Sequence, residues 1–247
     1  MRLRTTLGVA AGGLAAGAGL AALGYAALAG SAYTRFGHAT RTREKDEEDP
    51  ALDRFMALYD VVERHHIHVA APAAVTFGVA RDIDLSGSCV VRGMFRGREL
   101  MFGSTPAPTG VAEPPGIVAT ALRLGWGVLR DEAGHEIVLG AVTKPWEQNP
   151  VFHDLLPRDF AAFAEPDYVK IAWTLRADPL ADGTSIFRTE TRAIATDVDA
   201  RAKFRRYWAL VSPGVALIRR AMLEPIKREA ERLAVCAAEG PAVVAHV

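Results

Sequence analysis

The chain of 247 residues is 50% hydrophobic and 23% charged, a balance typical of a globular protein with a sizeable core. Its length suits one domain plus an appendage, because domains usually span about 100–200 residues. The 29 basic and 29 acidic side chains cancel, which argues against a nucleic-acid-binding protein that relies on a basic surplus. The two cysteines, Cys89 and Cys236, have neither metal-binding nor redox spacing and leave the redox compartment open.

The N-terminal residues predict a membrane segment. No charge occurs between Arg4 and Arg35, and residues 7–29 would span about 34 Å as a helix, enough to cross the hydrocarbon core of a bilayer. A cleaved signal peptide is the alternative, because residues 27–29 (ALA) match its cleavage site, although the apolar run is longer than a typical signal core. We therefore expect residues 1–34 to form a single-pass membrane anchor, with secretion after cleavage as the alternative.

Residues 35–50 are mostly polar, with clustered charges and a closing proline, and predict a linker. Their basic side chains slightly outweigh Arg2 and Arg4, which favours a cytoplasmic domain without fixing the side of the membrane. We expect one folded domain at residues 51–238 and a short tail at 239–247.

The domain opens with a predicted strand and helix. Residues 60–69 alternate apolar and polar side chains as a strand does, and Pro72 begins a predicted helix at 72–81. Residues 85–100 are ambiguous and expected to be helical in part. Residues 103–116 contain four prolines and three glycines, which predicts a long loop suited to act as a lid.

Alternating patterns bounded by turn sequences predict four further strands, at residues 125–130, 135–143, 168–177 and 184–195. A hairpin turn is expected at 131–134, because those residues read Asp-Glu-Ala-Gly. Residues 144–167 carry many large apolar side chains for a connection, so we expect them to fold against the core or over a pocket mouth.

The chain ends in an amphipathic stretch whose apolar residues recur at steps of three and four from Phe204 to Leu233. Ser212 and Pro213 predict a helix restart, which gives two helices, at 198–210 and 213–236. A kink is expected at Pro225. The solvated face is expected to carry the charged side chains Arg201, Arg205, Arg219, Lys227, Glu231 and Arg232.

Antiparallel strands with helices at both ends predict an α+β fold, in which a curved antiparallel sheet wraps around the long C-terminal helix. A straight helix cannot fill a concave surface, so a gap should remain between helix and sheet. Such a gap is a natural ligand site.

Three local sequences then point to a family. Residues 60–65 (DVVERH) lead to 70–73 (AAPA); residues 189–192 (TETR) are followed by 195–197 (ATD) and by 204–208 (FRRYW). These segments and their order, over about residues 58–236, resemble the SRPBCC superfamily, which includes START-type lipid-binding domains and polyketide cyclases. The resemblance implies a helix-grip fold that binds an apolar small molecule under its last helix. It implies no catalytic residue, because those residues vary among members.

Glu190 and Arg192 share a predicted strand face with Ile186 and Ile194, so we expect both charged side chains to point towards the C-terminal helix. There they would orient a polar ligand group, or Glu190 would serve as a base with a raised pKa. The alternatives are a structural ion pair, or a strand parity that places both side chains in water. The other candidate ligand-binding residues are His65, on the parity of the apolar strand positions, and Trp126, Trp173 and Trp208, for which core packing is the alternative.

The neighbouring histidines His65, His66 and His68 do not predict a metal site, since no cysteine or carboxylate spacing completes a ligand set. His66 and His68 are expected on a solvated strand face. The sequence contains no nucleophile-elbow, Cys-x-x-Cys or phosphate-binding loop motif, and we expect no cofactor. Basic residues near the start of the C-terminal helix are interpreted as solvated, with contact to anionic lipid as the alternative.

We therefore expect membrane-tethered binding of a hydrophobic small molecule, lipid-like or polycyclic, between the sheet and the C-terminal helix. A cyclase or dehydratase that uses Glu190, Arg192 or His65 for proton transfer is the alternative function, and a scaffold with a filled interior is the third. The expected partners are the small molecule and the membrane, without nucleic acid; the oligomeric state stays open.

Overall fold

The computed structural model describes residues 23–38, 48–84, 92–93, 96–97, 103 and 116–239. The first part of the predicted anchor, Cys89 and most of the two segments predicted at 85–100 and 103–116 lie outside these residues. Residues 23–35 are helical, and no helix within the described ranges combines the length and apolar character that crossing a bilayer requires. Cys236 is an exposed free thiol.

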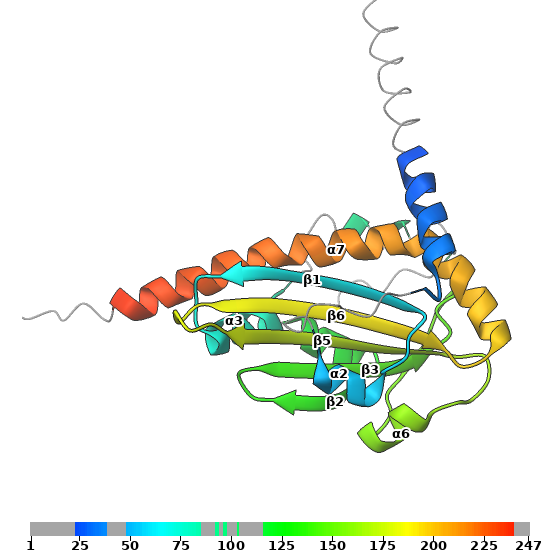
Figure 1. The fold of residues 1–247 in the computed structure, drawn as a ribbon, viewed down its shortest axis with the longest axis horizontal. Helices are drawn as coiled ribbons and strands as arrows, with labels where there is room; N and C mark the ends of the chain where they lie inside the picture. The colour runs from blue at the N-terminus through cyan, green and yellow to red at the C-terminus, as the bar shows by residue number, and fades with distance from the viewer. Residues whose placement is uncertain are drawn as a thin grey trace, which may run out of the picture.

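A single curved antiparallel sheet forms the centre of the domain (Figure 1). Its strand order is β1-β6-β5-β3-β2, and β4 pairs with β3. The strands are β1 Val61–Val69, β2 Gly127–Glu132, β3 Glu136–Thr143, β4 Phe152–His153, β5 Val169–Pro179 and β6 Ser185–Ala195. The five predicted strands are thus confirmed. The β2–β3 turn comes slightly later than predicted, with Gly134 at a φ of 76°.

The helices labelled in Figure 1 are α2 Pro50–Phe55, α3 Ala73–Asp82, α6 Pro157–Ala162 and α7 Val198–Glu239, and α5 is Ile117–Arg123. The prediction of two C-terminal helices is wrong, because α7 runs through Pro213 and Pro225 as one helix of 42 residues. A proline removes a single intrahelical hydrogen bond, and the apolar stripe that packs on the sheet continues past it. Figure 1 shows α7 bending towards its N-terminal end.

Helices cover both faces of the sheet. On one face α7, α3 and α5 bury a core that includes Phe77, Phe187, Met222 and Ile226. On the other face α2 and α6 bury a second core; its members include Leu52, Val138, Phe160 and Ala172. The segment 144–167 therefore folds against the core, as predicted: α6 packs on the face opposite α7, whereas Trp146 packs beside Phe204 of α7. The α+β class, the curved antiparallel sheet and the long C-terminal helix are confirmed.

A third cluster joins the N-terminal helix to the domain. The Phe36 ring packs edge-on against Phe204 of α7 with ring centroids 5.5 Å apart, and the other buried members of the cluster are Val61, Val169 and Ala193. Phe36 is only 6% exposed. Residues just after the N-terminal helix are thus part of the folded core, and they fix where the helix meets the sheet.

Candidate functional site

A groove of about 320 Å³ lies where the N-terminal helix, β1 and α7 meet. The N-terminal segment contributes Leu28, Ser31, Ala32, Arg35, Phe36 and His38. The start of β1 contributes Asp60, Val61, Val62 and Glu63, and α7 contributes Trp208, Ser212, Pro213 and Ala216. We call this the β1–α7 groove. Its volume falls within the range of about 300–1,000 Å³ that small-molecule sites occupy.

Asp60 holds the three walls of the groove together. Its carboxylate accepts hydrogen bonds from Arg201 Nε of α7 at 2.8 Å and from the Ala195 backbone N–H of β6 at 3.0 Å. Its backbone carbonyl accepts the Gly37 N–H at 2.8 Å. The side chain is buried, so these bonds satisfy a carboxylate that would be costly to bury alone. The groove is therefore built on fixed elements.

Aromatic and cationic contacts lie beside the groove, between the N-terminal segment and α7. Trp208 packs against Phe204 with ring centroids 6.0 Å apart, and Phe204 in turn contacts Phe36. The Arg205 guanidinium stacks over the Tyr33 ring at 3.9 Å, and Arg205 Nε donates to the Tyr33 carbonyl at 2.9 Å. These contacts hold the N-terminal helix against α7 and give the groove an aromatic wall that includes Trp208.

Polar groups lie next to the groove, between the sheet and α7. Arg219 of α7 points to the sheet, where its Nη2 donates to Thr191 Oγ1 at 2.7 Å and its guanidinium lies 4.6 Å from the Trp173 ring centre. Thr191 pairs in register with Glu63, a lining residue of the groove. Glu63 Oε2 lies 3.5 Å from His65 Nε2. Arg219 and the Glu63–His65 pair therefore lie on the same face of the sheet, beneath α7.

Burial lowers the pKa of the Arg219 guanidinium to about 10, and the negative charge of Glu63 opposes this shift. The prediction that Arg219 is solvated is wrong. Arg219 lies three residues before Met222 and seven before Ile226, both fully buried, so helical spacing places it on the stripe that faces the sheet. This helical spacing could have placed Arg219 on the sheet-facing side from the sequence alone. The prediction followed the charge of the residue instead.

Three of the predicted ligand-binding residues lie on the α7 face of the sheet. His65 faces α7 as predicted, and Trp173 Nε1 donates to Thr189 Oγ1 at 2.9 Å. Trp126 packs edge-on against Trp173 and stacks on Phe152. Trp126 and Trp173 therefore belong to the core beneath α7. Trp208 lines the β1–α7 groove itself.

Glu190 and Arg192 point away from α7, so their predicted orientation is wrong. Glu190 Oε1 accepts from Arg192 Nε at 2.6 Å, and Glu190 Oε2 lies 2.9 Å from Arg64 Nε. Arg192 also donates to the carboxylate of Asp53 at 2.5 Å and to the Met56 carbonyl at 2.7 Å. The network ties α2 and the segment after it to the sheet. This geometry is that of the structural ion pair, which was the alternative prediction. Both residues are therefore separated from the β1–α7 groove.

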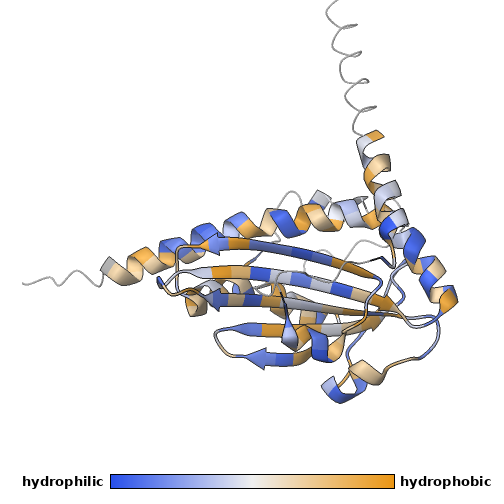
Figure 2. Cartoon of the chain, in the orientation of Figure 1, coloured by the Kyte–Doolittle hydropathy of each residue, from blue (hydrophilic) through white to orange (hydrophobic). Residues whose placement is uncertain are grey.

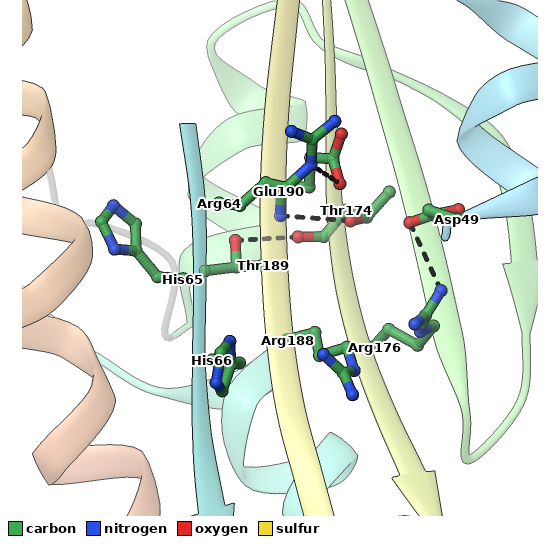
Figure 3. A pocket seen from close by; sticks show the side chains of 9 residues that line it. All are labelled: Asp49, Arg64, His65, His66, Thr174, Arg176, Arg188, Thr189 and Glu190. Atoms are coloured by element: carbon green, nitrogen blue, oxygen red, sulfur yellow. Dashed lines mark hydrogen bonds and ion pairs between the residues drawn. The ribbon is translucent and has the colours of Figure 1, made fainter. Parts of the chain in front are cut away.

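Figure 3 shows a second, polar pocket on the α2 face, beside this network. Arg64, Arg176, Arg188 and Glu190 contribute to it, while the His65 side chain points towards α7 and away from the others. Its volume of about 20 Å³ is room for about one water molecule. Size alone makes the β1–α7 groove the better ligand site.

Next to the polar pocket, two buried carboxylates face each other. Asp49 caps α2 by accepting the Leu52 N–H at 2.8 Å, and its second oxygen lies 3.8 Å from Arg176 Nη1. Burial, reinforced by the charge of Asp49, raises the pKa of Glu136 to about 7. Glu136 on β3 pairs in register with Arg176 on β5, whose charge partly opposes that shift. The contact between α2 and the sheet therefore includes a carboxyl group, Glu136, whose burial favours its protonated form.

His66 and His68 lie exposed on β1, which confirms the predicted solvated face. His68 Nε2 lies 2.9 Å from Thr184 Oγ1. Within the described ranges, no three histidine, cysteine or carboxylate side chains are grouped so that they could hold a metal ion.

No family model matches the chain, and no curated protein sequence matches it. Among solved structures, protein CV1439 from Chromobacterium violaceum is similar, with 13% identity over 63% of this chain and 95% of that chain and a TM-score of 0.25. Hypothetical protein jhp0584 from Helicobacter pylori is similar over 72% of this chain and 99% of that chain, with 9% identity and a TM-score of 0.28. At these TM-scores the similarities carry no conclusion about fold or function. The resemblance to the SRPBCC superfamily stays a prediction.

Proposed function

We propose that this protein is a membrane-tethered module that binds a hydrophobic small molecule, lipid-like or polycyclic, in the β1–α7 groove. The observation that carries the proposal is a groove of about 320 Å³ between the first strand and the long C-terminal helix. Leu28, Ala32, Val61, Trp208 and Ala216 give it an apolar wall that suits such a ligand. An SRPBCC-like helix-grip domain, as the sequence resemblance implies, would use the same side of α7.

The N-terminal helix supports the tether. It contributes lining residues to the groove, and its side chains Leu23 and Leu28 are 69% and 59% exposed. Figure 2 shows hydrophobic residues along this helix, which stands out from the domain. With residues 7–29, the span long enough to cross a bilayer, in the membrane, the groove would lie at the membrane surface. A ligand dissolved in the bilayer would then reach the groove at high local concentration.

Native mass spectrometry of the full-length protein, released from phosphatidylcholine nanodiscs, tests the proposal. We expect the wild type to carry one amphiphile per chain. The variant Ala216→Phe, which adds a ring inside the groove, should no longer carry the amphiphile. The control Leu217→Phe changes the adjacent side chain, which is 56% exposed on the outer side of α7, and should keep the ligand.

Two results would count against binding in this groove. One is an empty wild type in repeated preparations, with no gain in melting temperature from any added amphiphile. The other is an equal ligand load in Ala216→Phe and Leu217→Phe, because a ring inside the groove cannot coexist with a ligand there.

A further inference from the structure

The Arg219 guanidinium is a cation under α7 with little to neutralise it. Its hydrogen bonds within the described residues go to neutral threonine hydroxyls, to Thr191 at 2.7 Å and, more weakly, to Thr189 at 3.5 Å. No described carboxylate forms an ion pair with it, and Glu63 acts on it only through its more distant charge. Arg219 is half-buried, and cations that are partly removed from water are usually paired, so this arrangement requires a reason.

The nearest carboxylate is directed elsewhere. Glu63 Oε2 lies 3.5 Å from His65 Nε2, on the neighbouring odd position of β1. Thr191, which holds Arg219, is the register partner of Glu63 on β6. Arg219 thus keeps N–H donors and positive charge beside a lining residue of the groove. A guanidinium has five N–H donors in a fixed fork, the geometry that suits a carboxylate or phosphate oxygen pair.

The groove and the cation lie next to each other along α7. Ser212 and Ala216 line the groove, and Arg219 follows Ala216 by one helical turn on the same face. The Trp173 ring supports the guanidinium from the sheet side at 4.6 Å. An amphiphile with its chain against Trp208 and Ala216 would therefore direct its head group towards Arg219.

We infer that the ligand of the β1–α7 groove is an amphiphile with an oxyanion head, a carboxylate or a phosphate monoester, and that Arg219 binds that head. This inference rests on the proposed function. It names the ligand class, which the groove volume alone leaves open between neutral and anionic molecules.

Titration calorimetry of the full-length protein in phosphatidylcholine nanodiscs tests it, with empty nanodiscs as the blank. The probes are dodecanoate, dodecyl phosphate and dodecanol, which share one chain length. We expect the wild type to bind at least one of the two anions about 10- to 100-fold more tightly than dodecanol, as a charge-assisted hydrogen bond predicts. The preferred anion identifies the head group. Arg219→Met should remove the preference, so that the anions bind no more tightly than dodecanol.

The matched control is Arg220→Met, since Arg220 is the adjacent, exposed arginine on α7 and should leave the preference intact. Arg219→Lys keeps the charge without the fork and should retain part of the preference, which covers the case in which Arg219→Met fails to fold. Equal wild-type affinity for the anions and dodecanol would overturn the inference while the proposed function stands. A preference for the anions that persists in Arg219→Met would likewise overturn the inference while the proposed function stands. If the wild type binds none of the three, both proposals fall.

Discussion

The buried carboxylate Glu136 should make the stability of this domain fall as the pH rises. An ordinary glutamate pKa is 4.5, and burial raises the pKa of Glu136 to about 7. The folded chain therefore holds more protons than the unfolded chain between these two values, and its free energy of unfolding decreases across that window. Each pH unit corresponds to about 1.4 kcal/mol, so the full loss is at most about 3 kcal/mol.

Glu136→Gln keeps the shape of the protonated acid and removes its titration. We expect the variant to match the wild type near pH 4.5 and to exceed it by up to about 3 kcal/mol at pH 8. Urea unfolding of the full-length chain in a nonionic detergent, followed by tryptophan fluorescence at several pH values, measures the difference. Glu224→Gln, at an exposed position of α7, is the control and should follow the wild type. A Glu136→Gln variant that is less stable than the wild type at pH 8 would refute the reasoning.

Three further predictions concern the groove and the α2 face. Glu190→Gln removes the buried carboxylate that Arg192 shares with Arg64 and leaves Arg192 paired with the half-exposed Asp53, so it should lower the free energy of unfolding by about 1.5–3 kcal/mol in urea without changing ligand affinity; a loss of binding with intact stability would contradict this. Gly125→Ala should destabilise the domain by more than about 2 kcal/mol in the same assay, because φ is 95° and the new Cβ would meet the Phe152 carbonyl oxygen at 2.3 Å; a neutral effect would speak against that close approach. Phe36→Ala removes the edge-on contact with Phe204 and should increase hydrogen exchange in residues 23–38, whereas unchanged exchange would show that this cluster does not hold the N-terminal helix.

Much of the fold follows from local patterns. Alternation in the segments that became β1, β5 and β6, and the recurrence of apolar residues along α7, depend on backbone periods of 2 and 3.6 residues that the sequence displays directly. The α+β class follows from the order of these segments. The continuity of α7 through Pro213 could not be read in this way, because packing against the sheet decides it.

The candidate site depended on which face of the sheet each residue occupies. Ile186 and Ile194 were interpreted as marking the α7 face, but Ile194 packs against the second core under α2. When helices cover both faces, apolar residues no longer identify the inner face, and Glu190 and Arg192 were assigned to the wrong side. Arg219 was missed for the converse reason, because a charged helical residue is usually solvated. The groove itself combines three distant segments and has no local signature.

The most direct test of the groove is photo-crosslinking of the full-length protein with a dodecanoate that carries a diazirine on its chain, followed by mass spectrometric mapping of the modified residues. We predict modification within residues 28–38, 60–63 and 208–216, the three segments that line the β1–α7 groove. Modification concentrated in residues 48–59, on the α2 face of the sheet, would contradict ligand binding under α7.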